Sequence, residues 1–302
     1  TVPVVLEIAE RAREIAAPGA WIVDFTNPVG IVTRALLDAG HRAVGLCNVA
    51  IGFQRRFSSW LGVGPERVLV DQVGLNHLTW VRAVRLDGAD VLPDLLAEHG
   101  EDLAAELDLP RRLLDDLGAI PSYYLRYFYR HDDVVEALRG TKARAAEVAE
   151  IERELLRLYR DPSLAEKPAL LERRGGAFYS EAATALIASL VAGTGDVQVV
   201  DVRNGDALPG LAADDVVELP ARIEADGPVP LAQEPLAPEL LGLVQHVAAY
   251  ERLTAVAAVD RDPVAARKAL LAHPLIGQTA LVDRLLDELL AVDLPSAAGA
   301  LS

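Results

Sequence analysis

The alternation of hydrophobic and polar positions changes twice along the chain and divides it into three parts. In the first part, apolar residues three and four positions apart predict amphipathic helices, and the short apolar runs between them are typical of parallel strands buried on both faces. The predicted elements are a helix over residues 3–17, a strand over 21–25, a helix over 30–39, a strand over 43–46 and a helix over 49–61. This order predicts the later part of a doubly wound parallel sheet, with Asn48 capping the last helix.

The second part starts near residue 67, where apolar and polar residues alternate. Two such stretches, 67–71 and 78–86, predict antiparallel strands around a turn at 74–77. The third part returns to helical spacing. Its predicted elements are mainly helix from 92 to about 158, a helix over 181–192 capped by Ser180, strands over 197–202 and 216–223, and three helices between 238 and 294 divided at 262–263 and 273–274. The chain is therefore predicted to be an α/β protein.

Composition limits the classes of partner. The 302 residues carry a formal net charge of −16, which argues against nucleic acid or an anionic membrane surface as the partner. No apolar run approaches the roughly 20 residues of a membrane span. Cys47 is the only cysteine, so a reducing compartment such as the cytoplasm fits best. Methionine is absent, from which we expect the chain to lack its natural N-terminus.

Cys47 and His77 are candidate metal ligands. Each follows an apolar strand, where ligands gather in open α/β sheets. A thiolate and an imidazole both bind first-row divalent metals, and two protein ligands leave coordination positions open for substrate oxygens. The alternative is that the cysteine is a small buried side chain and the histidine an ordinary turn residue.

Asparagines flank both candidate ligands. Asn48 follows the cysteine and Asn76 precedes the histidine, so both amides could bind a polar substrate. Asn27 lies between a predicted strand and Pro28, where an amide can face a ligand while the proline fixes the turn, with a cis bond as one option. Taken alone, this Asn-Pro pair is also an ordinary turn.

The stretch 121–129 holds four of the seven tyrosines. A phenol is a weak base at its ordinary pKa near 10, but a nearby metal or guanidinium favours the phenolate, which can remove a proton from carbon. We expect one of these rings to be catalytic and the others to form an aromatic stripe in the core.

The stretch 173–181 combines two arginines, a glycine pair and a helix start. Helix N-termini near arginine bind anions, and a charged loop leading into a helix is the alternative. The sequence has no G-x-G-x-x-G after a strand, no G-x-S-x-G, no H-E-x-x-H and no P-loop. No pair of carboxylates stands out at strand ends, so an ordinary two-carboxylate glycosidase finds no support.

Together these motifs resemble glycoside hydrolase family 4. The stretches that carry the resemblance lie, in order, at 24–28, 45–48, 74–78, 121–129 and 175–183. Each is weak alone, but their order and spacing agree over roughly residues 1–225. Cys47 followed directly by Asn48 is similar to the branch of the family that acts on 6-phospho-β-glucosides.

The resemblance implies a lactate/malate-dehydrogenase-like architecture. Residues 1–66 would be the C-terminal part of a Rossmann-type NAD-binding domain, and residues 67–302 an α+β domain for substrate and metal. The implied cofactors are NAD⁺ and Mn²⁺ or another divalent metal. The implied protein is a homo-dimer or homo-tetramer that acts on a phosphorylated disaccharide or an aryl glucoside.

The implied reaction is a redox elimination and addition: oxidation at C3 of the sugar, removal of the C2 proton, loss of the C1 substituent, then water addition and re-reduction. A C3 ketone acidifies the C2 hydrogen, which gives this order a chemical reason. The family's functional residues match Cys47 and His77 as metal ligands, Tyr124 as the base with Tyr123 and Tyr127 as rivals, Asn27, Asn48, Asn76 and Arg174 as substrate contacts, and Asn27 also as a cofactor contact.

The chain departs from the family pattern in one large respect. The glycine-rich dinucleotide loop would precede Thr1, so we expect an incomplete NAD⁺ site and weak or no activity from this chain alone. Asp201 stands where the pattern leads us to expect asparagine. Two other functions remain open: a lactate/malate-type 2-hydroxy-acid dehydrogenase, which would need a histidine paired with a carboxylate and no metal, and a non-catalytic fragment.

Overall fold

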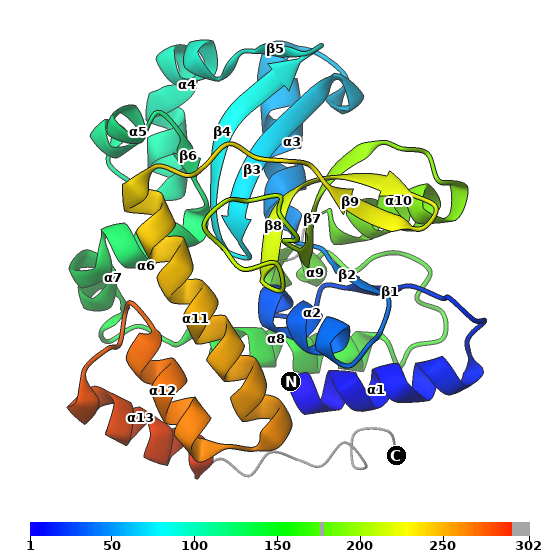
Figure 1. Cartoon of the computed structure of the whole chain (residues 1–302), viewed down its shortest axis with the longest axis vertical. Helices are drawn as coiled ribbons and strands as arrows, with labels where there is room; N and C mark the ends of the chain where they lie inside the picture. Colours follow the sequence, from blue (N-terminus) through cyan, green and yellow to red (C-terminus); the bar gives the residue numbers. More distant parts are fainter. Residues whose placement is uncertain (176–177, 292–302) are drawn as a thin grey trace.

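A nine-stranded mixed sheet organises the part of the chain that the structure describes, residues 1–175 and 178–291 (Figure 1). In this computed structural model the strand order is β1-β2-β7-β8-β3-β4-β5, with β6 beside β4 and β9 beside β8. Gly176 and Ala177 of the predicted anion-binding stretch, and the predicted end of the last helix near residue 294, lie outside the described residues.

The first five elements form a parallel strand–helix–strand unit, as predicted. They are α1 (Val2–Ile15), β1 (Ile22–Asp24), α2 (Val29–Asp38), β2 (Ala43–Gly45) and α3 (Asn48–Leu61). Strand β1 pairs with β2 in parallel. The predicted cap is wrong by one residue, because α3 already includes Asn48 and the extended residue before it is Cys47. The cysteine therefore lies at the junction between β2 and α3.

A long antiparallel hairpin follows. Strands β3 (Val68–Leu75) and β4 (Leu78–Leu86) are joined by a two-residue turn, Asn76–His77. Strand β4 has the predicted bounds, whereas β3 extends four residues beyond the predicted end at residue 71. His77 has a positive φ of 66°. Strand β4 also pairs with β5 (Ala89–Asp90) and β6 (Ile120–Pro121), two short strands that the pattern did not predict.

Strands β7 (Val197–Arg203) and β8 (Val216–Glu224) connect this hairpin to the parallel pair. The last strand, β9 (Gly227–Pro230), pairs only with β8. Gly45 of β2 pairs with Asp201 of β7, so one sheet runs from the first part of the chain into the second. A Cβ atom at Gly45 would lie 2.7 Å from the Cβ of Asp201, and this close approach requires glycine. The domain boundary between residues 66 and 67 stays a prediction.

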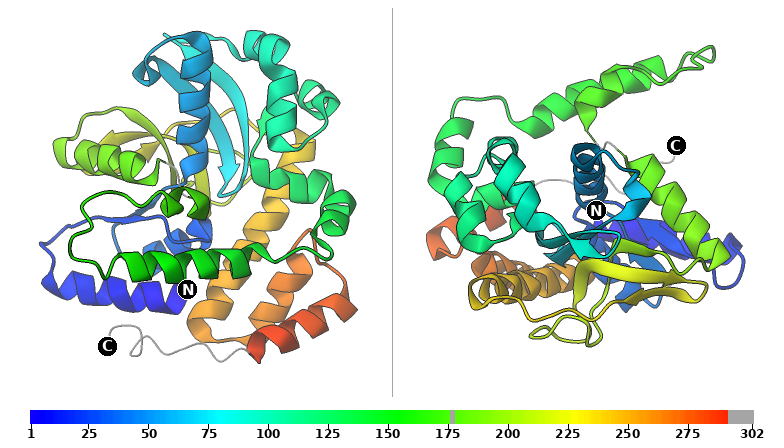
Figure 2. Two further views of the ribbon diagram at one scale, coloured as in Figure 1. Left: turned by 180° about the vertical axis from the view of Figure 1, so that it is seen from behind. Right: turned by 90° about the horizontal axis from the view of Figure 1, so that it is seen from above.

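Helices surround the sheet and the hairpin (Figure 2). They are α4 (Leu92–Leu107), α5 (Arg111–Leu117), the 3₁₀ turn η2 (Tyr123–Leu125), α6 (Arg126–Tyr129), α7 (His131–Leu138), α8 (Arg144–Leu158), α9 (Leu170–Arg174), α10 (Tyr179–Ala192), α11 (Pro238–Asp260), α12 (Pro263–Ala272) and α13 (Thr279–Leu290). Ser180 does not cap α10 as predicted, since α10 starts at Tyr179 after the left-handed Phe178. No helix in the described ranges is long and apolar enough to cross a membrane.

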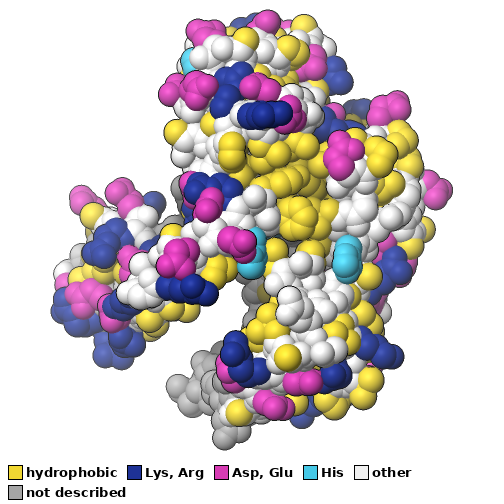
Figure 3. Space-filling view, turned by 90° about the vertical axis from the view of Figure 1, so that its left-hand side faces the viewer, with side chains coloured by type: hydrophobic (Ala, Val, Ile, Leu, Met, Phe, Trp, Pro, Cys, Tyr) yellow, Lys and Arg dark blue, Asp and Glu magenta, His cyan; other side chains and the backbone are white. Residues whose placement is uncertain are grey.

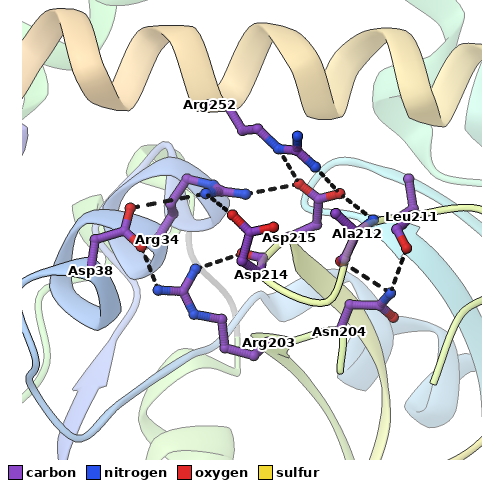
Figure 4. A network of polar contacts seen from close by, with 9 residues as sticks. All are labelled: Arg34, Asp38, Arg203, Asn204, Leu211, Ala212, Asp214, Asp215 and Arg252. Atoms are coloured by element: carbon purple, nitrogen blue, oxygen red, sulfur yellow. Dashed lines mark hydrogen bonds and ion pairs between the residues drawn. The ribbon is translucent and has the colours of Figure 1, made fainter. Parts of the chain in front are cut away.

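A buried ion-pair network ties α2, the loop before β8 and α11 together (Figure 4). Asp215 accepts a 2.8 Å hydrogen bond from Arg34 of α2 and is held from the other side by Arg252 of α11 at 2.6 and 2.7 Å. The side chains of Asp215 and Arg34 are 3% and 6% exposed. One carboxylate thus links three elements that lie far apart in the sequence.

Replacing Asp215 by alanine is expected to destabilise the protein by about 3–5 kcal/mol, because a buried guanidinium loses its partner. Asp214 offers a matched control, since its side chain is 64% exposed and lies 3.5 Å from the same arginine. Asp214→Ala is expected to cost less than about 1 kcal/mol. Urea unfolding of both variants measures the difference, and equal losses would contradict the assignment.

Candidate functional site

Cys47 lies at the carboxyl end of β2, where open α/β sheets bind ligands. Its free thiol is buried and receives hydrogen bonds from the side chain of Asn76 and the backbone of Val49. Burial, and then the negative charge of Glu218, raise the pKa of the thiol well above its ordinary value. The group stays protonated at neutral pH unless a cation replaces the proton.

His77 occupies the tip of the β3–β4 hairpin. Its ring stacks on that of Tyr124, with 3.8 Å between the ring centroids and 21° between the planes. Burial lowers the pKa of His77 to about 4, so the imidazole is neutral at physiological pH. Neutral imidazole is the form that binds metals.

Asn76 connects the two candidate ligands, because it precedes His77 in the chain and its side chain contacts Cys47. Within the described ranges, no group of three or more His, Cys, Asp or Glu side chains is placed to hold a metal ion by itself. The donors present, one sulfur and one imidazole nitrogen, nevertheless fit a divalent metal whose other positions are left to substrate and water. Both predicted ligands thus adjoin Asn76, one through its side chain and the other along the chain.

Tyr124 differs from its rivals in its contacts. It stacks on His77, whereas the guanidinium of Arg126 lies over the rings of Tyr123 and Tyr127, at 4.0 and 5.1 Å from their centroids. Tyr123 also packs edge-on against Tyr124, with 5.8 Å between the ring centroids. Burial, and then the neighbouring Cys47, raise the pKa of Tyr124. Tyr124 is therefore a neutral phenol when no cation lies beside it, and so it is not a permanently ionised base.

Asn27 follows β1, and its peptide bond to Pro28 is cis. Its side chain hydrogen-bonds Tyr179 at the start of α10, whose ring stacks on Phe25 at 5.3 Å. Burial, and then Cys47, raise the pKa of Tyr179 to about 12. Tyr179 was not among the predicted site residues, although it follows the Arg-Gly-Gly stretch that was singled out as an anion-binding candidate.

Arg174 stands apart from this cluster. At the end of α9, its guanidinium is held by Glu152 of α8 at 2.8 and 3.1 Å, and both side chains are about half exposed. Figure 3 shows the hollow beside the projecting segment that carries α8, with hydrophobic side chains gathered in it.

Asn48, by contrast, lies in the first turn of α3, next to Cys47. Cys47 also lines a mainly apolar cleft of about 460 Å³ between α3, α10, β3 and β7.

Three buried acids lie near Cys47, and of these the sequence pattern singled out Asp201 alone. Asp201 and Glu218 are register partners in β7 and β8, and Glu251 of α11 interacts with both. Burial raises the pKa of Glu218 to about 7 and that of Glu251 to about 8. Neither carboxyl oxygen of Asp201 has a hydrogen-bond partner, and burial raises its pKa well above the ordinary value. For Asp201 and Glu218 the available signal was an acidic residue inside the apolar pattern of a strand, whereas Glu251 lies in a helix.

Asp201→Asn is expected to stabilise the protein by roughly 1–3 kcal/mol at pH 8, because an amide does not ionise and each unit by which a pKa is raised is worth about 1.4 kcal/mol. The pKa of Asp201 is raised in the folded protein. The unfolded chain therefore loses this proton first as the pH rises above about 4, and the folded state loses stability. Urea unfolding at pH 5 and pH 8 should show the larger gain at pH 8; a gain independent of pH would contradict a protonated Asp201.

Two family models match the chain. The model described as "Family 4 glycosyl hydrolase" matches residues 1–63, and "Family 4 glycosyl hydrolase C-terminal domain" matches residues 72–276. A protein from Bacillus subtilis (strain 168) named "Probable 6-phospho-beta-glucosidase" is 38% identical over 96% of this chain and 68% of its own length. This chain therefore spans about two thirds of that relative.

Solved structures agree in fold. The 6-phospho-beta glucosidase from Thermotoga maritima, determined with manganese, NAD+ and glucose-6-phosphate, is 33% identical and has a TM-score of 0.85 over 95% of this chain and 69% of its own. A malate dehydrogenase from Cryptosporidium parvum, at 14% identity and a TM-score of 0.50 over 86% of this chain and 70% of its own, shares the fold alone. The predicted α/β, lactate/malate-dehydrogenase-like fold is confirmed.

Proposed function

The chain belongs to family 4 of the glycosyl hydrolases, and from this premise we propose that it hydrolyses 6-phospho-β-glucosides with NAD⁺ and a divalent metal such as Mn²⁺. The observation that carries the proposal is that Cys47 and His77 both adjoin Asn76 and that Tyr124 stacks on His77. Relatives named 6-phospho-beta-glucosidase, one of them solved with manganese, NAD+ and glucose-6-phosphate, support the substrate class and the cofactors.

The protein's own side chains have distinct tasks in this proposal. When bound, NAD⁺ supplies reversible oxidation at C3 of the sugar and the metal supplies positive charge beside the sugar oxygens. Cys47 and the neutral His77 hold the metal, and the thiol gives up its proton on binding it. Tyr124, packed on His77, is the group placed to take the C2 proton.

The polar side chains around this centre would orient the sugar. Asn27 at the end of β1 is placed to contact both substrate and NAD⁺, and Asn48 and Asn76 flank the metal ligands. For Arg174 to bind the substrate phosphate, its guanidinium would have to leave Glu152. A homo-oligomeric state and a cytoplasmic location remain parts of the proposal.

The first test is the cofactor requirement of a protein that contains this chain. We expect hydrolysis of 4-nitrophenyl-β-glucoside 6-phosphate to require both Mn²⁺ and NAD⁺, since the metal and the redox step act on the same sugar. Release of nitrophenol is measured with each cofactor omitted in turn. Full activity without either one contradicts the proposal, and oxidation of a 2-hydroxy acid without metal would favour the dehydrogenase alternative.

His77→Ala is expected to weaken Mn²⁺ binding at least about 10-fold. Losing a metal ligand should reduce the metal affinity at least as much as losing a group that only orients a ligand. Cys47→Ser should act in the same direction. His99→Ala is the matched control, since His99 also stacks on an aromatic ring, Trp60, at 4.3 Å. Titration calorimetry with Mn²⁺ measures the affinities; equal binding by the His77 and His99 variants would rule out His77 as a ligand.

Tyr124→Phe is expected to lower kcat by about 10²–10⁴-fold, the usual contribution of a general base. Exchange of the C2 hydrogen with deuterated solvent should be lost with it. Tyr123→Phe and Tyr127→Phe serve as controls, because these rings lie on Arg126. If either control loses exchange while Tyr124→Phe keeps it, the base is the other tyrosine.

A further inference from the structure

Glu218 lies where the two halves of the sheet meet. Its Cα in β8 pairs with Gly74 of β3 on one side and with Asp201 of β7 on the other. The side chain is 1% exposed. Its carboxyl group therefore depends on groups inside the protein for its hydrogen bonds.

Both oxygens of the Glu218 carboxyl group accept hydrogen bonds from the β3–β4 hairpin, which carries His77 at its tip. Oε2 accepts a 2.9 Å hydrogen bond from Nδ2 of Asn76, and Oε1 accepts one from Nε2 of Gln72. Gln72 lies at the irregularity in β3, and Asn76 is the first residue of the turn. One side chain of β8 thus holds the hairpin both in its strand and at its tip.

Asn76 relays this contact to both proposed metal ligands. It is covalently joined to His77, and its side chain also hydrogen-bonds the sulfur of Cys47. An amide nitrogen carries two hydrogens, enough for Glu218 and the sulfur together. His77 has a φ of 66°, a conformation that non-glycine residues keep where their surroundings hold them.

We propose that Glu218 is a positioning residue of the metal site, which fixes the His77 turn against Cys47 through Asn76. The inference rests on the proposed function, since the metal ligands are proposed there. Burying an acid beside Asp201 costs stability, and a neutral side chain would fill the space at lower cost. The carboxyl group supplies what an apolar residue lacks, two acceptors directed at one hairpin.

Glu218→Ala is expected to weaken the binding of Mn²⁺ alone about 10- to 100-fold, the usual effect of removing a group that orients a metal ligand. Titration calorimetry without substrate measures it, and circular dichroism verifies folding. Glu218→Gln keeps one acceptor oxygen but turns an amide NH₂ toward Gln72 or Asn76, so a smaller loss is expected. This variant carries the test if the alanine variant does not fold.

Asp201→Asn is the matched control. Asp201 is a buried acid beside Glu218, but its own carboxyl oxygens have no hydrogen-bond partner. Its replacement by asparagine should therefore leave Mn²⁺ affinity unchanged. With Co²⁺ as a spectroscopic probe, the thiolate-to-cobalt absorption should change in the Glu218 variants and stay the same in Asp201→Asn. A general loss of stability would not produce this contrast.

Two results would overturn the inference: wild-type Mn²⁺ affinity in folded Glu218 variants, or equal losses in Glu218→Gln and Asp201→Asn. The second would mean that only the buried charge matters. Failure of the proposed function has a different signature. In that case the unaltered protein does not bind Mn²⁺, or Cys47→Ser binds it as tightly as the unaltered protein does.

Discussion

The pairing of Gly45 in β2 with Asp201 in β7 joins the parallel part of the sheet to its antiparallel part. Because Cys47 follows Gly45 by two residues, this junction brings the thiol to the region where β8 meets the β3–β4 hairpin. Asn76 and Glu218 lie at that meeting point. The site therefore lies where the parallel and antiparallel parts of the sheet join. The two parts can pair there because Gly45 has no side chain.

The charges inside the protein are arranged in two contrasting ways. Asp215 is matched by Arg34 and Arg252, and this network links α2, α11 and the loop before β8. Asp201, Glu218 and Glu251 lie close to one another, and their pKa values rise because burial removes them from water. The paired charges hold the frame together, whereas the unmatched acids lower its stability next to the site. Strained or costly groups of this kind are typical of functional regions.

Much of the architecture was predictable from local pattern. The strand–helix–strand unit at the start, the hairpin around residue 76 and the three C-terminal helices all follow from periodicity and turn residues, and the structure agrees within a few residues. The errors lie at ends and interruptions. Asn48 and Ser180 are not caps, because Cys47 and Phe178 occupy the positions before the helices. Strand β6 interrupts the long helical region, since its pairing with β4 is non-local.

The sequence by itself determined which chemical groups are available: one thiol, a turn histidine, flanking asparagines and a tyrosine cluster. Their spacing along the chain placed the thiol, the histidine and the asparagines at the end of a predicted strand or in a turn, and the tyrosines in a mainly helical region. Only the tertiary structure decided which tyrosine stacks on His77, and it left Arg174 bound to Glu152 outside the cluster. It also revealed the buried acids, whose contacts come from strands and a helix far apart in the sequence. Periodicity reports the face on which a side chain lies, but its partner across the sheet depends on strand order and register, which local pattern does not encode.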